Sequence, residues 1–326
     1  MPDELWFTRC PVPTATGVAA DRGRLAEEFA PDGITVRSLQ DLPPDGRLAG
    51  AHFTHELPGL FREGGNVPAL WARSRGEPTR LIALTWIEER QAVLVREDSP
   101  VDSPAALAGL RLAVPRHPIA IDFWRAMALH GHAGALSLAG LTLADAELVE
   151  VPGSPDGQWE GELAALRDGR VDAVYVKGAL AVEAARRYGA RVAVDLDAAP
   201  DRRARVNNGT PRPVTVHQRL LDEHPDLVAR FLAVLLESAD WARGHPAELA
   251  RILGAETGAG PEGVAGAYRA AATADGLGLD LSEERLALLE RQQRFLSAHG
   301  FLPAPVDVRA WADPEPLRRA HALLTT

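Results

Sequence analysis

Short apolar runs alternate with segments in which apolar residues recur every three or four positions through the first two thirds of the chain. The short runs are partly β-branched and have turn residues at their edges, which predicts strands. The predicted strands are Leu5–Phe7, Ile34–Leu39, Leu81–Trp86, Gln91–Arg96, Arg111–Pro115, Glu147–Val151, Ala173–Val176 and Arg191–Val194. The periodic segments predict helices over Thr14–Phe29, Leu57–Arg73, Pro104–Ala108, Ile121–His130, Gly161–Asp168 and Leu180–Tyr188. This alternation predicts an α/β architecture rich in parallel strands.

From Val216 onward the pattern is helical. Apolar residues at three-to-four spacing predict helices over Gln218–Leu221, Pro225–Ala242, Pro246–Leu253, Gly263–Ala271, Glu283–His299 and Trp311–Leu324. Two earlier stretches, Arg96–Ser103 and Leu196–Asn208, have the character of crossovers between lobes. We therefore predict two lobes, with residues 1–97 and 197–326 in lobe 1 and residues 98–196 in lobe 2. A length of 326 residues is consistent with two lobes.

Composition narrows the class of protein. Apolar residues make up 46% and charged residues 25%, which is ordinary for a globular protein. The net charge is −10 and the basic residues are scattered, which argues against a nucleic-acid partner. No apolar run approaches the ~18–20 residues of a membrane span. The acidic start, Met1–Glu4, lacks the features of a signal peptide, so we expect a cytoplasmic protein, acting as a monomer.

Cys10 is the only cysteine of the chain, which excludes an internal disulfide and a multi-cysteine zinc site. It follows the first predicted strand and precedes a predicted helix, at the edge where open α/β sheets bind ligands. Pro11 and Pro13 stiffen this loop and aim the thiol. We expect the N-terminus of the helix that follows to stabilise a thiolate. Taken alone, a single cysteine is more often a small buried residue than a nucleophile.

A second segment, residues 51–65, supplies imidazoles, a guanidinium and a Gly-Gly turn. His52 is a candidate to tune the thiol or relay a proton, and we expect Phe53 and His55 to line the same pocket. Arg62 suits an anion with two oxygens on one centre, and Gly65 lets backbone N–H groups approach it. The alternatives are a solvated helical arginine and an ordinary turn.

Lys177, the only lysine, ends a predicted strand of lobe 2. It is a candidate for a second contact to an anionic substrate, such as a carboxylate; the alternative is a lysine paired with nearby acidic groups. His52 and His55 have a spacing that superficially suits a metal, but no further ligand cluster accompanies them, so we expect no metal site. No dinucleotide or phosphate-binding glycine motif is present, and no cofactor is expected.

Several phrases resemble the type 2 periplasmic-binding-protein-like family, in the branch that binds sulfonates, nitrate and thiamine precursors. These phrases are residues 65–76, Asp98–Pro100, Leu107–Arg111 and Gly169–Ala173. Within this branch the chain is similar, nearly end to end, to the hydroxybiphenyl sulfinate desulfinases of dibenzothiophene desulfurisation. That similarity rests on Cys10–Pro13, His52–Thr54, Arg62 with Gly64 and Gly65, Val171–Ala173, Trp241–Arg243, Leu286–Arg291, Gln293 and Phe295–Leu296.

The resemblance implies a two-lobed fold with a helical C-terminal region, and a hydrolase that cleaves the C–S bond of an aromatic sulfinate to release sulfite. It implies that Cys10 carries the cleavage with His52 beside it, while Arg62 and the Gly65 amide hold the sulfinate. Whether the thiol protonates the ring carbon or the thiolate attacks sulfur stays open. Lys177 has no counterpart in the desulfinases and lobe 2 is shorter here, so the carbon skeleton of the substrate also stays open.

Two other functions fit the same fold. One is a solute-binding protein for a sulfonate, nitrate or carboxylate. The other is a dehydratase or decarboxylase acting on a carboxylate, for which Lys177 would be a suitable contact.

Overall fold

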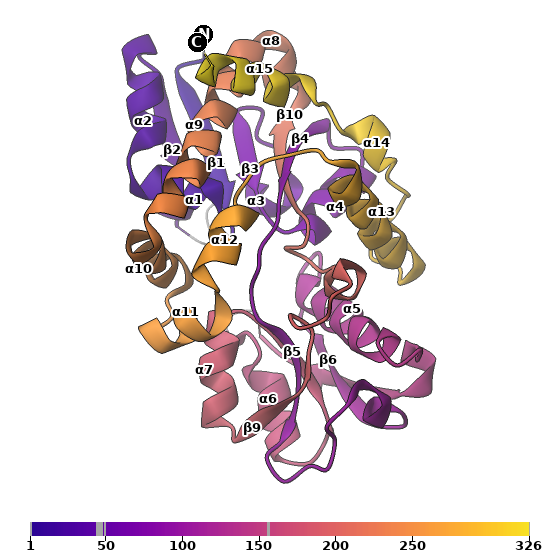
Figure 1. Cartoon of the computed structure of the whole chain (residues 1–326). Helices are drawn as coiled ribbons and strands as arrows, with labels where there is room; N and C mark the ends of the chain where they lie inside the picture. Colours follow the sequence, from indigo (N-terminus) through magenta and orange to yellow (C-terminus); the bar gives the residue numbers. More distant parts are fainter. Residues whose placement is uncertain (1, 44–47, 49, 155–156, 326) are drawn as a thin grey trace. The chain divides into compact units, whose positions relative to one another are not determined.

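The computed structural model describes residues 2–43, 48, 50–154 and 157–325. The chain divides into two compact units. Their segments can be followed in Figure 1, where the colours give the residue numbers. Unit 1 comprises Met1–Ile87, Gly209–Glu256 and Ala270–Thr326, and unit 2 comprises Glu88–Asn208 and Thr257–Arg269. These boundaries differ from the predicted ones, because the strand predicted at Gln91–Arg96 pairs with two strands of unit 2 rather than with unit 1.

Unit 1 is built on a five-stranded sheet. Its strands are β1 (Glu4–Arg9), β2 (Thr35–Ser38), β3 (Leu60–Glu63), β4 (Thr79–Thr85) and β10 (Arg212–His217). They lie in the order β2-β1-β3-β10-β4. β1 runs parallel to β2 and β3, whereas β10 runs antiparallel to β3 and β4. The carboxyl ends of β1 and β3 therefore lie side by side, next to the start of β10.

The helix predicted over Leu57–Arg73 is wrong in its first half. That half contains β3, whose four residues are all buried between β1 and β10, and only then does α4 (Asn66–Ser74) begin. A four-residue apolar run has no periodicity of its own, and pairing with two neighbours decides its structure. The helix predicted over Thr14–Phe29 is likewise two helices, α1 (Ala15–Asp21) and α2 (Arg24–Phe29), separated by the left-handed Gly23.

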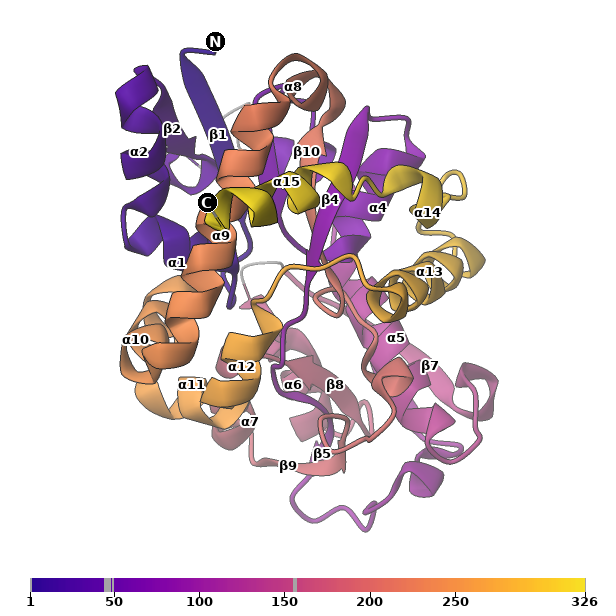
Figure 2. The same ribbon diagram turned by 45° about the horizontal axis from the view of Figure 1, so that its top comes forward.

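Helices pack around this sheet (Figure 2). They are α3 (Ala51–Thr54), α8 (Gln218–Glu223), α9 (Pro225–Gly244), α10 (Pro246–Thr257), α12 (Ala270–Gly276), α13 (Glu283–Ala298), α14 (Val308–Trp311) and α15 (Glu315–Leu324). The long helix α9 contacts α1, α2 and α15. In the described ranges, no helix has both the length and the apolar character needed to cross a membrane.

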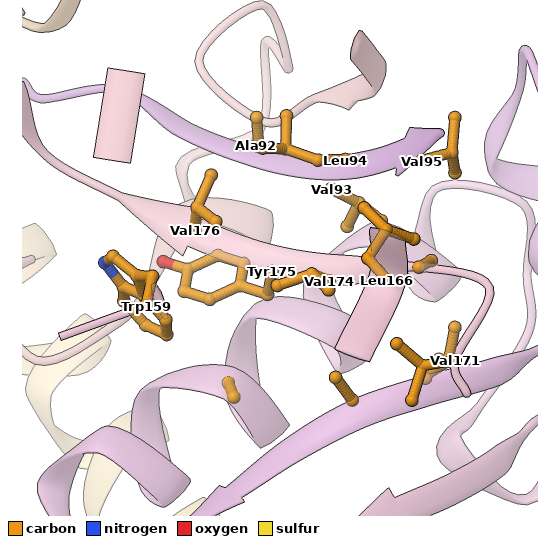
Figure 3. Packing of buried hydrophobic residues seen from close by; sticks show 14 of the residues in the cluster. Ala92, Val93, Leu94, Val95, Trp159, Leu166, Val171, Val174, Tyr175 and Val176 are labelled. Carbon is orange, nitrogen blue, oxygen red and sulfur yellow. The ribbon is translucent and has the colours of Figure 1, made fainter. Parts of the chain in front are cut away.

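Unit 2 has an antiparallel sheet, β8-β5-β9, and a parallel pair, β6 and β7. The strands are β5 (Gln91–Arg96), β6 (Arg111–Arg116), β7 (Glu147–Pro152), β8 (Val174–Lys177) and β9 (Ala190–Asp195), and the helices are α5 (Phe123–Ser137), α6 (Glu160–Arg167), α7 (Ala179–Arg187) and α11 (Pro261–Ala267). Trp159 and Tyr175 lie in its apolar core beside Val176 (Figure 3). Every strand predicted from the sequence overlaps a strand of the two units.

Candidate active site

Cys10 lies directly after β1, where its backbone N–H donates to the carbonyl of Glu63 at the end of β3 (3.3 Å). Its Sγ is 3.7 Å from Nε2 of His52 and accepts a hydrogen bond from the backbone N–H of Gly65 at 3.4 Å. The thiol is half-buried. The structure thus brings together the cysteine, the first histidine and the second glycine of the Gly-Gly turn.

The helix that stabilises this thiol is not the one predicted. The carboxylate of Glu63 accepts hydrogen bonds from the backbone N–H groups of Ala15 (3.3 Å) and Thr16 (2.8 Å), so the N-terminus of α1 is already occupied. Gly65, which donates to Cys10, is instead the N-cap of α4. The carboxylate of Glu63 therefore binds at the N-terminus of α1, where we expected the thiolate of Cys10.

His52 lies on the short helix α3, with each ring nitrogen directed at a different partner. Nδ1 is 2.8 Å from the hydroxyl of Thr8, and that hydroxyl accepts a hydrogen bond from the side-chain amide of Gln40 at 2.9 Å. Burial lowers the pKa of His52, although its hydrogen bond with Cys10 acts in the opposite direction. A neutral imidazole held at both nitrogens therefore faces the thiol.

Arg62 lies on β3 and is only 1% exposed, so the alternative of a solvated helical arginine is wrong. Its Nε donates to the carbonyl of His52 (2.7 Å), and Nη2 donates to the carbonyl of Gly65 (3.1 Å). Nη1 is buried and has no hydrogen-bond partner among the described residues. A Cβ on Gly64 would be 2.6 Å from the guanidinium carbon, so the glycine there lets the guanidinium lie against the backbone.

Burial lowers the pKa of Arg62 to about 10, which leaves the guanidinium charged at neutral pH. Nη1 of the charged Arg62 side chain, near the thiol, is thus a donor without a partner among the described residues. A buried charged donor without a partner is costly and marks a place for an anion.

Arg212, the first residue of β10, belongs to the same site and was missed by the sequence analysis. It is 2% exposed, and its Nε and Nη1 are buried without a hydrogen-bond partner among the described residues. The only strand signal was the β-branched run Val214–Val216, and the prolines at 211 and 213 weakened it because proline is uncommon in a central strand.

The charges around Cys10 determine its protonation. Burial raises the pKa of the thiol, but the charge of Arg212 and the hydrogen bond with His52 oppose this effect. The charge of Arg62 adds to them, and together these groups hold the pKa of Cys10 well below its ordinary value. The site therefore favours a thiolate next to two guanidiniums.

The two other residues predicted for this pocket lie at different depths. Phe53 is half-buried, and its ring packs edge-on against His52 with the centroids 4.9 Å apart. His55 is 1% exposed, and its Nε2 is 2.8 Å from the hydroxyl of Thr215 on β10. Burial and the charge of Arg62 lower the pKa of His55 to about 3, so this ring is a neutral group within the first unit.

Lys177 belongs to unit 2, at the end of β8. Its Nζ is 2.7 Å from the carboxylate of Glu89, with side-chain exposures of 6% and 2%. Of the two alternatives, a lysine paired with an acidic group is thus the one that this geometry presents, although the pair is buried rather than on the surface.

In the described ranges, no cluster of three or more His, Cys, Asp or Glu side chains is arranged to hold a metal ion. The functional groups that the structure brings together at Cys10 are the thiol, the imidazole of His52 and the guanidiniums of Arg62 and Arg212. These groups suit an anion bound next to a sulfur nucleophile or acid.

Comparison with known proteins gives the site its context. A family model described as NMT1/THI5 like matches residues 66–249. The chain is 31% identical over 358 residues to the 2'-hydroxybiphenyl-2-sulfinate desulfinase of Rhodococcus erythropolis, an alignment that covers 96% of this chain and 92% of the relative. The desulfinase of Rhodococcus qingshengii matches with the same identity and coverage.

Two solved structures have folds similar to that of this chain. The crystal structure of a cysteine-to-serine mutant of the enzyme DszB in complex with biphenyl-2-sulfinic acid has a TM-score of 0.77 at 28% identity, covering 98% of this chain and 99% of that chain. The periplasmic aliphatic sulphonate binding protein SsuA from Escherichia coli has a TM-score of 0.73 at 16% identity, covering 96% and 92%. The predicted type 2 periplasmic-binding-protein-like fold is confirmed.

Proposed function

Because this chain belongs to the NMT1/THI5-like family, with the 2'-hydroxybiphenyl-2-sulfinate desulfinases among its relatives, we propose that it is itself a desulfinase. It hydrolyses the C–S bond of an organic sulfinate, aromatic in the relatives, and releases sulfite. One observation carries the proposal: the only thiol of the chain lies 3.7 Å from an imidazole nitrogen and beside a buried guanidinium, one of whose donors has no partner among the described residues. The DszB complex supports it, since a cysteine-to-serine mutant of that enzyme is in complex with a sulfinic acid.

The overall reaction needs no redox partner. A sulfinate anion, R–SO2⁻, and one water give R–H and hydrogensulfite, HSO3⁻. The carbon keeps the electron pair of the C–S bond and gains a proton, the sulfur gains the hydroxide of water, and no electrons enter or leave the reaction. Residues that hold an anion and move one proton are therefore sufficient.

In this proposal Arg62 and Gly65 hold the sulfinate. The unpartnered Nη1 of Arg62 donates to one sulfinate oxygen, and the N–H of Gly65 approaches the same group from the N-cap of α4. Charge-assisted hydrogen bonds of this kind are about twice as strong as neutral ones. Phe53 contributes an apolar surface beside His52 for the carbon skeleton.

Two routes use Cys10 and His52 within this arrangement. In one, the thiolate attacks sulfur, the carbon leaves with a proton, and water then hydrolyses the S–S bond to return the thiol and hydrogensulfite. In the other, the thiol protonates the ring carbon, SO2 departs and is hydrated, and the thiolate recovers a proton. His52 positions the sulfur in both. Intact mass spectrometry of acid-quenched turnover separates the routes, because only the first adds SO2 to the protein.

The experiment that tests the function is sulfite release by the purified protein from a panel of arene- and alkanesulfinates. We expect sulfite from the wild type and none from Cys10→Ser, while the variant still binds the preferred sulfinate. A wild type that binds sulfinates or sulfonates but releases no sulfite would instead identify a solute-binding protein, the function suggested by the fold of SsuA. Preference for carboxylates over all sulfinates would favour a dehydratase or decarboxylase.

A further inference from the structure

Arg212 is a buried cation that forms no ion pair with any acidic side chain that the structure describes. It is 2% exposed, and neither Nε nor Nη1 has a hydrogen-bond partner among the described residues. Burying a charge without a partner costs several kcal/mol. A fold that keeps a guanidinium in this state therefore points to a ligand that completes it.

The backbone on both sides of Arg212 is fixed to the turn that carries Gly65. Asn66 donates from its side-chain amide to the carbonyl of Pro211 (2.8 Å), and the N–H of Gly64 donates to the carbonyl of Pro213 (3.2 Å). β10 pairs antiparallel with β3, with Val214 opposite Glu63, so Arg212 lies opposite Gly65 when the register is continued by two residues. The backbone of Arg212 is thus held next to the N-cap of α4, the residue that also donates to Cys10.

The nearby carboxylate does not neutralise Arg212. Glu63 lies on the adjacent strand, but its oxygens accept from the N–H groups of Ala15 and Thr16 and from the hydroxyl of Thr85 (2.9 Å). No ion pair joins Arg212 to an acidic side chain in the described part of the chain. The positive charge is therefore available to the thiolate and to a bound anion.

We propose that Arg212 is the second anion-binding guanidinium of this site, and that with Arg62 it recognises the oxygens of the substrate sulfinate and of the product sulfite. This inference rests on the proposed function and extends it to the residues that bind the substrate oxyanion. In the described part of the chain, Nη1 of Arg62 and the Nε and Nη1 of Arg212 are buried without a hydrogen-bond partner, and all three can donate to one oxyanion because each of its oxygens accepts about two hydrogen bonds. Sulfite and sulfonates also carry oxygens on sulfur, so the product binds competitively and sulfonates act as unreactive ligands.

The same guanidinium has a measurable effect on the free protein. Arg212 is the largest charge that lowers the pKa of Cys10, and Cys10 is the only cysteine. The pH dependence of alkylation by iodoacetamide, read by intact mass, therefore reports this one thiol. The other ionisable groups facing Cys10 are His52 on α3 and Arg62 on β3, while Glu63 is engaged by α1 and Arg9 is paired with Glu256 at 2.7 Å.

The experiment compares Arg212→Gln and Arg212→Lys with the wild type and with Arg80→Gln. Arg80 is a matched control, because it lies on β4 of the same sheet, opposite Val216 rather than Arg212, and donates to the carbonyl of Ala310 (3.0 Å). Each protein is alkylated across pH, alone and with benzenesulfonate or sulfite as the protecting ligand. Circular dichroism and a thermal melt establish that each variant is folded.

In Arg212→Gln we expect the pKa of Cys10 to rise by about one unit or more, since a neighbouring positive charge lowers a pKa by about 1–3 units. We expect protection by benzenesulfonate and by sulfite to need about 10- to 100-fold more ligand, the loss typical of a charged hydrogen bond. In Arg212→Lys both the pKa of Cys10 and the ligand concentration needed for protection should lie between those of the wild type and Arg212→Gln. Both values in Arg80→Gln should match the wild type.

A folded Arg212→Gln protein with unchanged alkylation profile and unchanged protection would overturn the proposal, as would equal losses in Arg80→Gln. The readout needs no turnover. If the wild type releases no sulfite, but Arg212→Gln is protected less by sulfonate than the wild type, the anion site is supported and the proposed desulfinase activity is contradicted. If the wild type releases sulfite and Arg212→Gln is alkylated and protected like the wild type, the activity is supported and the proposed role of Arg212 is contradicted.

Discussion

The hydroxyl of Thr8 lies 2.8 Å from Nδ1 of His52, and this contact determines which nitrogen of the imidazole carries the proton. The Thr8 hydroxyl oxygen accepts a hydrogen bond from the side-chain N–H of Gln40. The proton of that hydroxyl is therefore free to be donated and needs an acceptor of its own. Within the described residues, Nδ1 of His52 is the acceptor that the structure provides. The proton of the neutral ring is therefore on Nε2, facing the sulfur of Cys10.

Replacing Thr8 by valine removes this hydroxyl and keeps the volume. We expect kcat for sulfinate to fall about fivefold to tenfold, the value of one hydrogen bond, because His52 loses its preferred tautomer. KM should change little, since the anion-binding groups are untouched. Steady-state kinetics with sulfite detection measure both. Thr8→Ser restores the hydroxyl and should restore kcat; equal kcat in Thr8→Val and wild type would contradict the assignment.

Gly64→Ala is expected to disturb the anion site from the backbone. The added Cβ would lie 2.6 Å from the guanidinium carbon of Arg62, so the guanidinium must move away from the carbonyl of Gly65. We expect KM for the sulfinate to rise about tenfold or more, the weight of one charged hydrogen bond. Gly59→Ala is the control, because its Cβ would meet only the carbonyl of Glu4 at 3.6 Å. The same KM in both variants would argue against this packing.

Glu63→Gln tests the internal cap of α1. The amide that replaces one carboxylate oxygen cannot accept from both Ala15 and Thr16, so one backbone N–H is left unsatisfied and a charged hydrogen bond is lost. We expect the free energy of unfolding to drop by about 1–3 kcal/mol. Urea denaturation followed by circular dichroism measures this difference. The exposed Glu56, changed to glutamine, serves as the control and should unfold like the wild type.

Glu162 in the second unit makes stability depend on pH. Burial, with a smaller effect from the charge of Asp122, raises the pKa of this carboxyl to about 7, and neither oxygen has a hydrogen-bond partner among the described residues. The unfolded chain, with a pKa of about 4.3, binds fewer protons than the folded one between these values. The contribution of Glu162 to the free energy of unfolding is therefore complete below pH 4, decreases as the pH rises, and is lost above pH 7.

Glu162→Gln removes the cost of ionising the buried group. The variant should unfold at nearly the same urea concentration as the wild type at pH 4.5, and be more stable by up to about 3 kcal/mol at pH 8. Glu160→Gln, on the same helix, changes a partly exposed carboxylate that pairs with Arg187 at 3.0 Å, and should show no such change between the two pH values. A stability difference in Glu162→Gln that is the same at both pH values would refute the linkage.

Local patterns were enough to find part of this site. Cys10 follows the predicted first strand, at the edge where open α/β sheets bind ligands. The Gly-Gly turn follows β3, which was not predicted, so the roles of this turn and of His52 came mainly from the family resemblance. The strand carrying Arg62 was hidden, because its four buried residues look like the first turn of the helix that follows.

The rest depends on contacts that are distant along the chain. Arg212 reaches the site only because β10 returns to unit 1 and pairs with β3, with Thr215 opposite Arg62. Lys177 pairs with Glu89 because β8 is aligned with β5, which places Gln91 opposite Lys177. Neither partner can be read from neighbouring residues, since strand order and register decide both.

The chain carries a single thiol in its first unit and a single lysine in its second, the latter buried against Glu89. These two side chains form a natural pair of orthogonal reporters. A thiol reagent counts the fraction of molecules whose anion site is empty, while an amine reagent, read at Lys177 by peptide mapping because the N-terminal α-amine also reacts, counts the fraction whose second unit has opened. One dual-label mass spectrum can therefore follow ligand occupancy and local unfolding in the same unaltered protein.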